Sequence, residues 1–463
     1  MIEYKPTIGL EIHVELKTTT KMFCRCKNDA DENRPNVNIC PVCMAHPGTL
    51  PVPNLEAMRH VLRVGQAVGG TLADFTEFDR KNYFYPDIPK GYQLSQFKYP
   101  LVEGGELSGV KLTRIHLEED TARSQHTGLG ESLIDYNRAG VPLMELVTEP
   151  VITSSKQAGD FARELQLLIG PEYLHISEAN MEKGEMRVEA NISLNMGTKV
   201  EVKNLNTISG MEKAIEFELA RQRELLEHGD VVVQETRGWD ENTAKTFSQR
   251  KKESSHDYRY FPDPDIPKFY LSQMPELQNL ELPELPWQKR DRLKSEFGVK
   301  ESDVEIFVAD RILGGIFENT MIELADKKYS QLVANYLTSD FIGLRKANPE
   351  LKTPRASDFA ELVVLVESGE IGSRGAKDIL AVMVTEGGSP KNIAEQKGLF
   401  QKSDEGALAL IIDQVIAENE TAVTEFKSGN ERSLQFLIGQ GMKLSKGSAN
   451  PAILTKIFKE KLS

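Results

Sequence analysis

The run Thr7-Ile-Gly-Leu-Glu-Ile-His-Val-Glu-Leu16 alternates apolar and polar side chains over ten residues. Because successive side chains of a strand point to opposite faces, one face carries the apolar residues Ile8, Leu10, Ile12 and Val14. The other face carries the ionisable residues Glu11, His13 and Glu15. The run predicts a half-buried strand whose polar face is available for chemistry.

The first 260 residues contain further short strand-like runs, interrupted by helical patterns at 55–68, 155–169 and 209–228. Strands and helices in irregular order predict an α+β fold with a mostly antiparallel sheet. Six prolines from Phe261 to Pro286 mark a boundary, and helical periodicity follows it. We expect an α+β domain over 1–290, a helical domain over 291–398 and a small helical tail over 399–463.

The composition, 40% hydrophobic and 27% charged residues in a chain of 463, is that of a globular protein with several domains. The sequence shows no run of 18 apolar residues and no secretory signal, so we expect a cytoplasmic protein without membrane spans. A net charge of −14 argues against non-specific coating of nucleic acid. A specific RNA partner stays possible through a basic patch near the end, unless these lysines only form a solvated helix face: Lys443, Lys446, Lys456, Lys459 and Lys461.

All four cysteines lie close together, as Cys24-Arg-Cys26 and Cys40-Pro-Val-Cys43, with thirteen residues between the pairs. Two short thiolate pairs are what a tetrahedral Cys₄ zinc site requires. The alternatives are reduced structural thiols or a redox pair, and His46 is a competing fourth ligand. A closed Cys₄ site has no open coordination position, so we expect the catalytic residues elsewhere.

Three acidic runs are candidates for a cation site. The first strand offers Glu11 and His13, a second run is His116-Leu-Glu-Glu-Asp120, and a third places four polar side chains at strand spacing: Glu185, Arg187, Glu189 and Asn191. Each run alone is typical of a solvated strand face. Together they predict a cavity wall, where converging carboxylates would hold Mg²⁺ against nucleotide phosphates. His13 is a poor Mg²⁺ ligand and would act through water or as a base.

The stretch from Phe78 to Gln96 combines cations with aromatic side chains. Its cations are suited to phosphates: Arg80, Lys81 and Lys90. Its tyrosines would stack on a base or a terminal adenosine, or serve as half-buried strand residues: Tyr83, Tyr85 and Tyr92. The run His256-Asp-Tyr-Arg-Tyr-Phe-Pro262 has the same two interpretations.

Other catalytic motifs are missing from the sequence. It has no P-loop and no serine nucleophile segment of the amidase type, and every cysteine belongs to the metal spacing. We therefore expect that the chain does not release ammonia from glutamine by covalent catalysis.

Nine segments resemble the GatB family, the B subunits of tRNA-dependent amidotransferases. They are GLEIHVELKT, FDRKNYFYPDIPKGYQLSQ, HLEEDTARS, DYNRAGVPLMELVTEP, RVEANIS, VEVKNLN, QETRGWDENTAKT, SRGAKDIL and GQGMKLSKGSANP. The resemblance runs from about residue 6 to the C-terminus.

The resemblance implies an activity. A glutaminase A subunit releases ammonia, which travels to the B subunit, and a small C subunit clamps A and B into a heterotrimer. With ATP and Mg²⁺, the B subunit phosphorylates the side-chain carboxylate of Glu-tRNA(Gln), Asp-tRNA(Asn) or both, and ammonia displaces the phosphate. The implied fold is a cradle similar to the glutamine synthetase catalytic domain, followed by helical domains that grip tRNA.

The resemblance also implies roles for residues. It gives catalytic roles to Glu11, His13, Glu119 and Lys81, of which all but the lysine also bind the metal. Nucleotide contacts fall to Glu118, Glu189 and Lys90, with either Glu118 or Glu119 on the metal, and we add Arg187 from the third acidic run. Contacts with tRNA fall to Lys443 and Lys446, and we add Tyr83 and Tyr85 from the aromatic pattern. Zn²⁺ on the cysteines would lie near the acceptor end.

Two alternatives come from other functional classes. One is an ATP-dependent ligase that acts on a free amino acid, and the other is a non-catalytic tRNA-binding subunit. The first leaves the helical domains and the basic tail without a purpose, and the second leaves the acidic and basic residues of the cradle unexplained.

Overall fold

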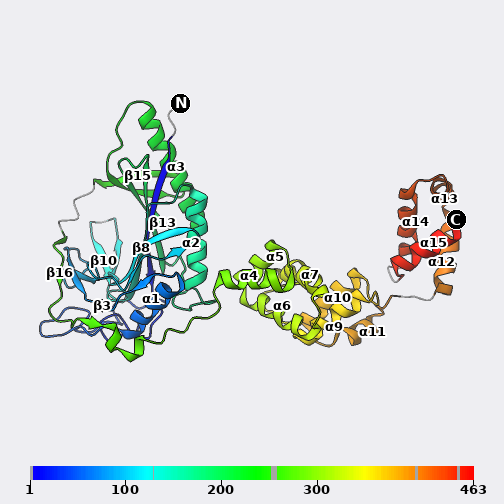
Figure 1. Cartoon of the computed structure of the whole chain (residues 1–463), viewed down its shortest axis with the longest axis horizontal. Helices are drawn as coiled ribbons and strands as arrows, with labels where there is room; N and C mark the ends of the chain where they lie inside the picture. The colour runs from blue at the N-terminus through cyan, green and yellow to red at the C-terminus, as the bar shows by residue number, and fades with distance from the viewer. Residues whose placement is uncertain (1–3, 129, 252–257, 402–404, 446–448, 463) are drawn as a thin grey trace. The chain divides into compact units, whose positions relative to one another are not determined.

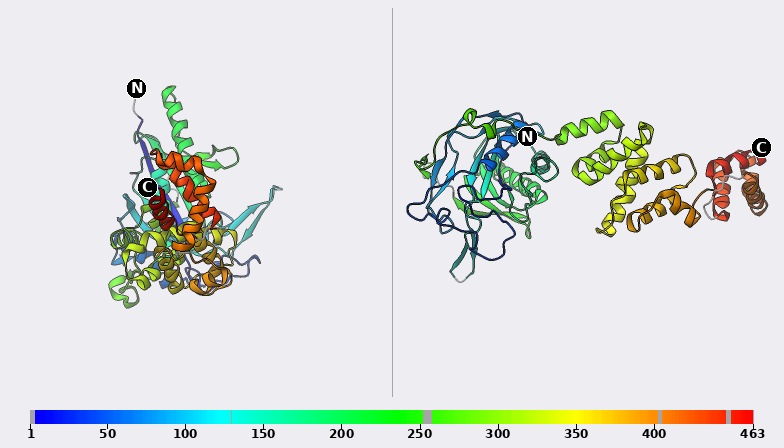
Figure 2. Two further views of the ribbon diagram at one scale, coloured as in Figure 1. Left: turned by 90° about the vertical axis from the view of Figure 1, so that its right-hand side faces the viewer. Right: turned by 90° about the horizontal axis from the view of Figure 1, so that it is seen from below.

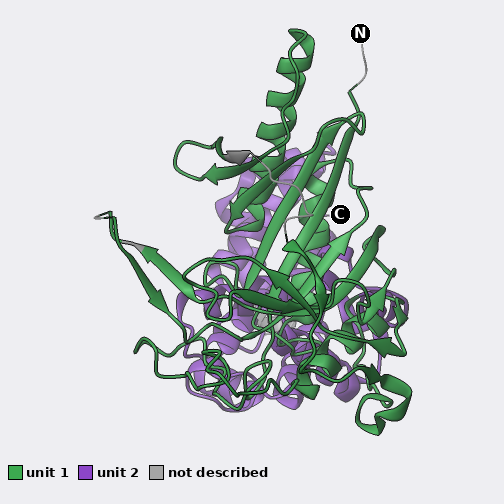
Figure 3. Ribbon diagram, turned by 90° about the vertical axis from the view of Figure 1, so that its left-hand side faces the viewer, with its two compact units in different colours: residues 1–286 green, residues 287–463 purple. Residues whose placement is uncertain are grey.

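The computed structural model describes residues 4–128, 130–251, 258–401, 405–445 and 449–462. The chain divides into two compact units, residues 1–286 and 287–463 (Figures 1 and 3). The first unit combines a large sheet with helices and the second is helical, which is compatible with the predicted α+β class. The predicted division into three domains stays a prediction.

The first unit is built on a sheet with the strand order β15-β14-β13-β12-β1-β11-β8-β5-β4-β16. Among the described strand pairs of this sheet, β13–β14 is parallel and the others are antiparallel. The bounds along this order are β15 (Lys245–Lys251), β14 (Glu235–Asp240), β13 (Val200–Leu205), β12 (Met186–Leu194), β1 (Pro6–Glu15), β11 (Pro142–Thr148), β8 (Val110–Glu119), β5 (Tyr92–Ser95), β4 (Asp79–Asn82) and β16 (Phe261–Pro262).

Shorter strands complete this unit. Three of them belong to the same sheet: β6 (Val102–Glu103) and β7 (Glu106–Leu107) pair with β8, and β2 (Thr71–Leu72) pairs with β6. Two separate pairs are β9 (Arg123–His126) with β10 (Ser132–Asp135), and β3 (Phe75–Thr76) with β17 (Phe269–Tyr270). The β9–β10 pair extends away from the body of the unit (Figures 2 and 3).

The predicted first strand is β1, and its alternation divides the sheet into two faces. Its apolar side chains, Ile8, Leu10, Ile12 and Val14, are fully buried. On that side α3 (Ile208–Glu227) packs on β12 and β13, with α2 (Ser155–Ile169) against it (Figure 1). The polar face of β1 is therefore left for the site.

The helices of the first unit begin where the sequence provides caps. The Asn54 side chain accepts from two backbone N–H groups at the start of α1 (Leu55–Ala67). Ser154 and Thr207 cap α2 and α3 in the same way. Two 3₁₀ turns, Leu271–Gln273 and Pro275–Leu277, lie in the proline-rich segment.

In its described part the second unit contains helices: α4 (Pro286–Phe297), α5 (Glu301–Ala309), α6 (Arg311–Leu324), α7 (Ser330–Asn335), α8 (Ile342–Ala347), α9 (Ala356–Glu367), α10 (Ser373–Thr385), α11 (Pro390–Lys397), α12 (Glu405–Glu418), α13 (Glu420–Lys427), α14 (Glu431–Leu444) and α15 (Pro451–Leu462). A 3₁₀ turn, Lys327–Tyr329, precedes α7, and a π-helical turn, Tyr336–Phe341, joins α7 to α8. The buried cluster of the last helices draws only on residues between Leu408 and Leu462. No helix among the described residues combines the length and hydropathy that a membrane crossing needs.

Candidate active site

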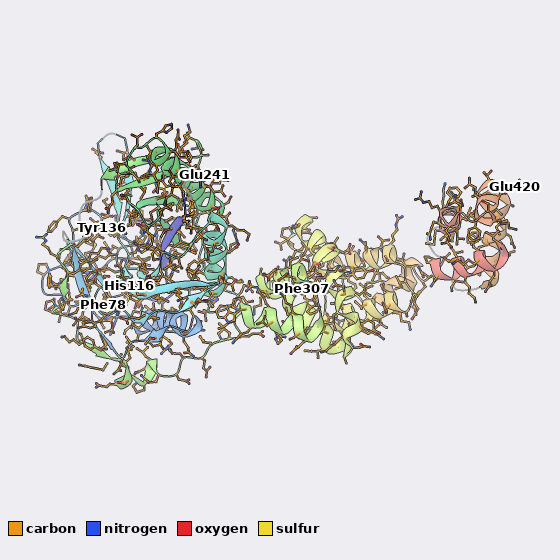
Figure 4. All side chains as sticks on the ribbon, turned by 45° about the horizontal axis from the view of Figure 1, so that its top comes forward. Phe78, His116, Tyr136, Glu241, Phe307 and Glu420 are labelled. Carbon is orange, nitrogen blue, oxygen red and sulfur yellow. The ribbon has the colours of Figure 1, made fainter. Side chains whose placement is uncertain are left out.

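The central strands line up four ionisable side chains across the polar face of the sheet. His13 on β1 lies opposite Arg187 on β12 and opposite Glu145 on β11. Glu145 lies opposite His116 on β8, which Figure 4 labels. The strand register thus joins residues from four separate parts of the sequence in one row.

Glu145 is the centre of this row. Its Oε2 lies 3.3 Å from His13 Nε2 and 3.6 Å from His116 Nε2, and its Oε1 lies 3.6 Å from a terminal nitrogen of Arg114. Burial raises the pKa of the Glu145 carboxyl, but the charge of His116 and the hydrogen bond from His13 outweigh it and hold the pKa well below its usual range. Glu145 is therefore a buried anion surrounded by basic side chains.

The pKa of His13 is also set by the neighbouring carboxylates. Its Nε2 also lies 3.9 Å from Glu11 Oε1. Burial lowers the pKa of His13, but the hydrogen bond and charge of Glu145, together with the charges of Glu11 and Glu189, raise it to about 9. At neutral pH the imidazole is then a cation, so in this arrangement it balances the carboxylates rather than acting as a base.

Lys81 and Glu118 extend the cluster toward β4. Glu118 Oε1 lies 3.6 Å from His116 Nε2 and 3.9 Å from Lys81 Nζ. Its Oε2 accepts a 2.9 Å hydrogen bond from Gln93. Burial lowers the pKa of Lys81, but the charge of Glu118 outweighs it and holds the pKa well above its usual value. A buried cation that keeps its charge is suited to a phosphate.

Two sets of side chains have the spacing of metal ligands: Glu11, His13 and Glu145, and His116, Glu118 and Glu145. Within each set the donor atoms lie within 4.8 Å of one another. Three buried polar atoms near these sets have no hydrogen-bond partner in the described part of the chain: Arg114 Nε, His116 Nδ1 and Asn191 Oδ1. Mg²⁺ prefers oxygen ligands to imidazole nitrogens, so the carboxylates of these sets are the better candidate Mg²⁺ ligands.

The two candidate nucleotide contacts on β12 are held by protein partners. Arg187 donates a 2.7 Å hydrogen bond to Asp120 Oδ2, and Lys203 Nζ lies 2.8 Å from a Glu189 oxygen. Burial and the charge of Asp120 raise the pKa of Glu15 to about 8. Arg187, opposite His13, thus interacts with Asp120, while the Glu189–Lys203 pair lies opposite Glu11.

Glu119 turns away from this cluster. Adjacent strand residues point to opposite faces, so Glu118 and Glu119 diverge. Glu119 Oε2 accepts a 2.6 Å hydrogen bond from Lys90 Nζ, and its Oε1 accepts one of 2.9 Å from the Leu94 backbone. The structure therefore brings Glu11, His13, Glu118 and Lys81 together but places Glu119 and Lys90 on the other side of β8.

Glu119 and Lys90 line the same open pocket as Cys24, Cys43 and His46. The four cysteines are free thiols whose sulfurs lie within 4.8 Å of one another. The Sγ–Sγ distances are 4.0 Å for Cys26–Cys43 and 3.9 Å for Cys40–Cys43. A zinc tetrahedron with Zn–S bonds of about 2.3 Å needs about 3.8 Å, so the cysteines fit zinc without His46.

The environment of the cysteines favours at least one thiolate. Hydrogen bonding from Cys24 lowers the pKa of Cys43 to about 5, and the charge of Lys21 adds to this effect. A thiolate is the form that binds metal.

The tyrosines form part of an aromatic chain at the edge of the site. Ring centroids lie 6.0 Å apart for Tyr83–Tyr85 and 5.9 Å for Tyr83–Tyr258. The chain continues through Tyr260, whose ring stacks on Phe97 at 4.1 Å. Tyr83 also donates to Gln93, the partner of Glu118. The tyrosines are thus partly packed on one another.

In the tail, Lys443 is exposed in the last turn of α14. Lys446 lies outside the described residues. Lys461 pairs with Asp413 and also donates to the Ala409 carbonyl. The solvated-face interpretation therefore fits Lys461, and Lys443 is the residue of the proposed tRNA contact that the structure describes.

Sequence reasoning missed Glu145. The signal was present, because a single acid interrupts the otherwise apolar run Pro-Leu-Met-Glu-Leu-Val from Pro142 to Val147. An acid at the centre of a buried strand needs partners, and only the strand register shows which ones.

Comparison with known proteins gives a consistent result. The family model described as the GatB/GatE catalytic domain matches residues 6–275, and the GatB domain matches residues 316–462. The chain is 40% identical to the B subunit of the aspartyl/glutamyl-tRNA(Asn/Gln) amidotransferase of Gloeothece citriformis, over 99% of this chain and 98% of that one. It is 40% identical to the protein of the same name from Brevibacillus brevis and 41% identical to that from Persephonella marina, in both cases over the full length of both chains.

Proposed function

Because the chain belongs to the GatB family, the B subunits of tRNA-dependent amidotransferases, we propose that the polar face of its sheet activates a carboxylate on tRNA. The substrates are Glu-tRNA(Gln), Asp-tRNA(Asn) or both, in keeping with the names of its relatives. The observation that carries the proposal is the convergence of Glu11, Glu145 and Glu118 with Lys81 on one face.

The reaction needs two steps. A carboxylate resists attack by ammonia, because its charge repels the nucleophile and oxide is a poor leaving group. In the first step a side-chain oxygen attacks the γ-phosphorus of ATP, and ADP leaves. In the second step ammonia attacks the acyl carbon and phosphate leaves. Both steps depend on positioning and on neutralisation of charge more than on a protein nucleophile.

The residues of the polar face divide this work. Glu11, Glu145 and Glu118 would hold Mg²⁺, which neutralises phosphate charge when bound. Lys81 is close enough to Glu118 to face the same phosphates. His13 keeps Glu145 in place from the neighbouring strand. Arg187 and Glu189 keep their proposed roles as nucleotide contacts. To bind a nucleotide they would have to give up their partners Asp120 and Lys203.

Glu119 and Lys90 serve the other side of β8. Their ion pair lines the pocket that also contains the cysteines, and we assign it to the approach of ammonia. A carboxylate there accepts a proton from arriving ammonium and leaves the neutral amine, which is the reactive form. Zinc on Cys24, Cys26, Cys40 and Cys43 would brace this wall, near the acceptor end of the tRNA.

The tRNA needs contacts at both ends of the chain. Tyr83 and Tyr85 belong to the aromatic chain near Lys81 and would stack on the terminal adenosine. Lys443, with Lys446, would meet backbone phosphates. The first unit then acts as a cradle like that of glutamine synthetase, and a helical domain from 291 and a tail from 399 follow it in the sequence. Because its substrate is a tRNA used in translation, the enzyme would work in the cytoplasm.

The proposed reaction needs ammonia from a partner subunit. Membership among the B subunits implies an assembly, and the proposed assembly is a heterotrimer with a glutaminase A subunit and a small C subunit. The A subunit provides the ammonia.

The test uses this chain co-purified with both partners, with glutamine and γ-labelled ATP. Glu-tRNA(Gln), Asp-tRNA(Asn) and uncharged tRNA are compared for ATP cleavage and amide formation. We expect cleavage coupled to amidation of a charged tRNA, which also identifies the substrate. Cleavage that is indifferent to tRNA would instead indicate a ligase for a free amino acid. No cleavage at all would leave a tRNA-binding subunit.

A further inference from the structure

Lys21 is a buried cation beside the cysteines. Its side chain is among the largest that are fully buried, and the residue is 1% exposed. Moving an ammonium group out of water is costly unless an anion or several acceptors surround it. The partners of Lys21 therefore indicate what its surroundings must supply.

Those partners do not include a carboxylate. Lys21 Nζ donates to the Tyr136 carbonyl at 3.1 Å and lies 4.0 Å from Cys43 Sγ. Within the described residues, no carboxylate oxygen is within 4.0 Å of this nitrogen. Among the described side chains that can carry a negative charge, Cys43 is the one within 4.0 Å of Lys21 Nζ.

The backbone holds the lysine in this position. Its N–H donates to the Cys26 carbonyl at 3.0 Å, and the next residue, Met22, donates to Gly140 at 2.7 Å. A Cβ built on Gly140 would lie 3.7 Å from both Lys21 Cδ and Cys43 Cβ, and 3.8 Å from Glu119 Oε2, which is paired with Lys90. The side chain therefore lies between the cysteine-containing loop, residues 24–43, and the segment that leads into β11.

We propose that Lys21 is the counter-charge of the zinc site: its ammonium group offsets part of the net negative charge that four thiolates impose on a bound Zn²⁺. The inference rests on the proposed zinc site. Four thiolates around a divalent ion leave two negative charges, and one fixed cation nearby halves that excess. Lys21 is a positioning residue, because it acts on the metal through Cys43 and the loop that Tyr136 belongs to.

A packing role is the competing explanation, and three substitutions separate the two. Lys21→Arg keeps the charge, Lys21→Gln keeps a polar group without charge, and Lys21→Met keeps only the apolar stem. Lys27 provides the matched control. Lys27 follows Cys26 directly but is exposed and paired with Asp29. Lys27→Gln therefore removes a lysine that does not contact the sulfurs.

The experiment measures metal affinity of the chain in complex with its partner subunits. Zinc is competed with a chromophoric chelator, and Co²⁺ substitution reports the sulfur ligands through its absorption spectrum. We expect K27Q to bind like the unaltered chain and K21R within about threefold of it. K21Q and K21M should lose about 10- to 100-fold in affinity, the range for residues that support metal ligands.

Each outcome has a distinct meaning. If K21Q binds zinc as tightly as the unaltered chain, the counter-charge proposal is wrong. It is also wrong if only K21M loses zinc affinity, because that result indicates a packing role. No metal in the unaltered chain overturns the zinc site itself, while carboxylate activation by the first unit is still tested separately by ATP cleavage.

A second variant guards against failure to fold. Cys43→His replaces one thiolate by a neutral ligand, so the site needs less compensation. If Lys21 is the counter-charge, K21Q should cost much less metal affinity and stability in the C43H background than alone. An equal penalty in both backgrounds, or an unfolded chain in both, overturns the proposal.

Discussion

Glu145 shows how much a single residue contributes to this site. It is a buried anion with His13, His116 and Arg114 within 3.6 Å, on two neighbouring strands. Removing its charge leaves the His13, His116 and Arg114 side chains without the carboxylate that they share, in a poorly solvated space. The residue is also common to both sets with metal-ligand spacing.

We expect Glu145→Gln to lower tRNA-dependent ATP cleavage by about 100-fold or more, because it removes an oxygen donor and the partner of His13. The assay is γ-phosphate release by the assembled enzyme, with tRNA affinity measured in parallel. Glu149→Gln is the control, since Glu149 follows β11 and accepts from Thr113 near the surface. Full activity of E145Q would remove this cluster from the mechanism.

His60 provides a prediction about pH. Its Nε2 donates to the Lys17 carbonyl at 3.0 Å, while its Nδ1 is buried without a partner among the described residues. Burial lowers the pKa of His60 below the ordinary 6.5. Between the two values the unfolded chain binds a proton that the folded chain does not. Stability is therefore full above about pH 6.5 and falls as the pH decreases through the lowered pKa.

The measurement is the free energy of unfolding against pH from 5 to 8, for the unaltered chain and for His60→Gln. The variant should lose less stability on acidification, because its amide can still donate to Lys17 but does not titrate. His228→Gln, at the exposed end of α3, is the control. Parallel profiles for all three chains would contradict the assignment.

At the scale of the element, β8 serves two sites. Glu118 faces His116 and Lys81, whereas Glu119 faces Lys90 and the pocket of the cysteines. Strand alternation alone produces this separation, because neighbouring side chains leave opposite faces. Two adjacent acids thus belong to different chemical steps.

We predict that the two substitutions fail differently. Glu118→Gln should abolish tRNA-dependent ATP cleavage, since it removes the carboxylate that Lys81 and His116 share. Glu119→Gln should keep much of the ATP cleavage but lower amide formation by about tenfold or more, because it disrupts the proposed ammonia side. Phosphate release and amide are measured in the same reaction. Identical defects in both assays would contradict two separate roles.

At the scale of the whole molecule, the tail has a core of its own. Among the described residues, the cluster from Leu408 to Leu462 draws on α12 to α15 and includes none from the earlier helices. Lys443 lies exposed at the end of α14, and Lys461 is held by Asp413. A folded tail with one exposed and one paired lysine allows a controlled test of tRNA contact.

We expect Lys443→Gln to weaken tRNA binding several-fold and to reduce the slope of log affinity against log salt by about one, the effect of one lost phosphate contact. ATP cleavage at saturating tRNA should be unchanged. Lys461→Gln should alter neither quantity, because that lysine already has a carboxylate partner. An unaltered salt slope for K443Q would place the tRNA contact elsewhere.

Local pattern in the sequence determined a large part of this protein. The alternation from Thr7 to Leu16 predicted β1 and its two faces, the helical pattern over 155–169 predicted α2, and the cysteine spacing predicted the sulfur cluster. These features depend on residues a few positions apart, whose geometry the backbone alone sets.

Tertiary structure decided which residues meet. The register of β1, β8 and β11 put Glu145 between His13 and His116 and sent Glu119 away from the sets with metal-ligand spacing. Pairing of β1 with β11 joins positions more than a hundred residues apart, and a shift of one residue would reverse every face. Local sequence pattern does not determine this register. Only the folded sheet therefore shows which side chains are partners.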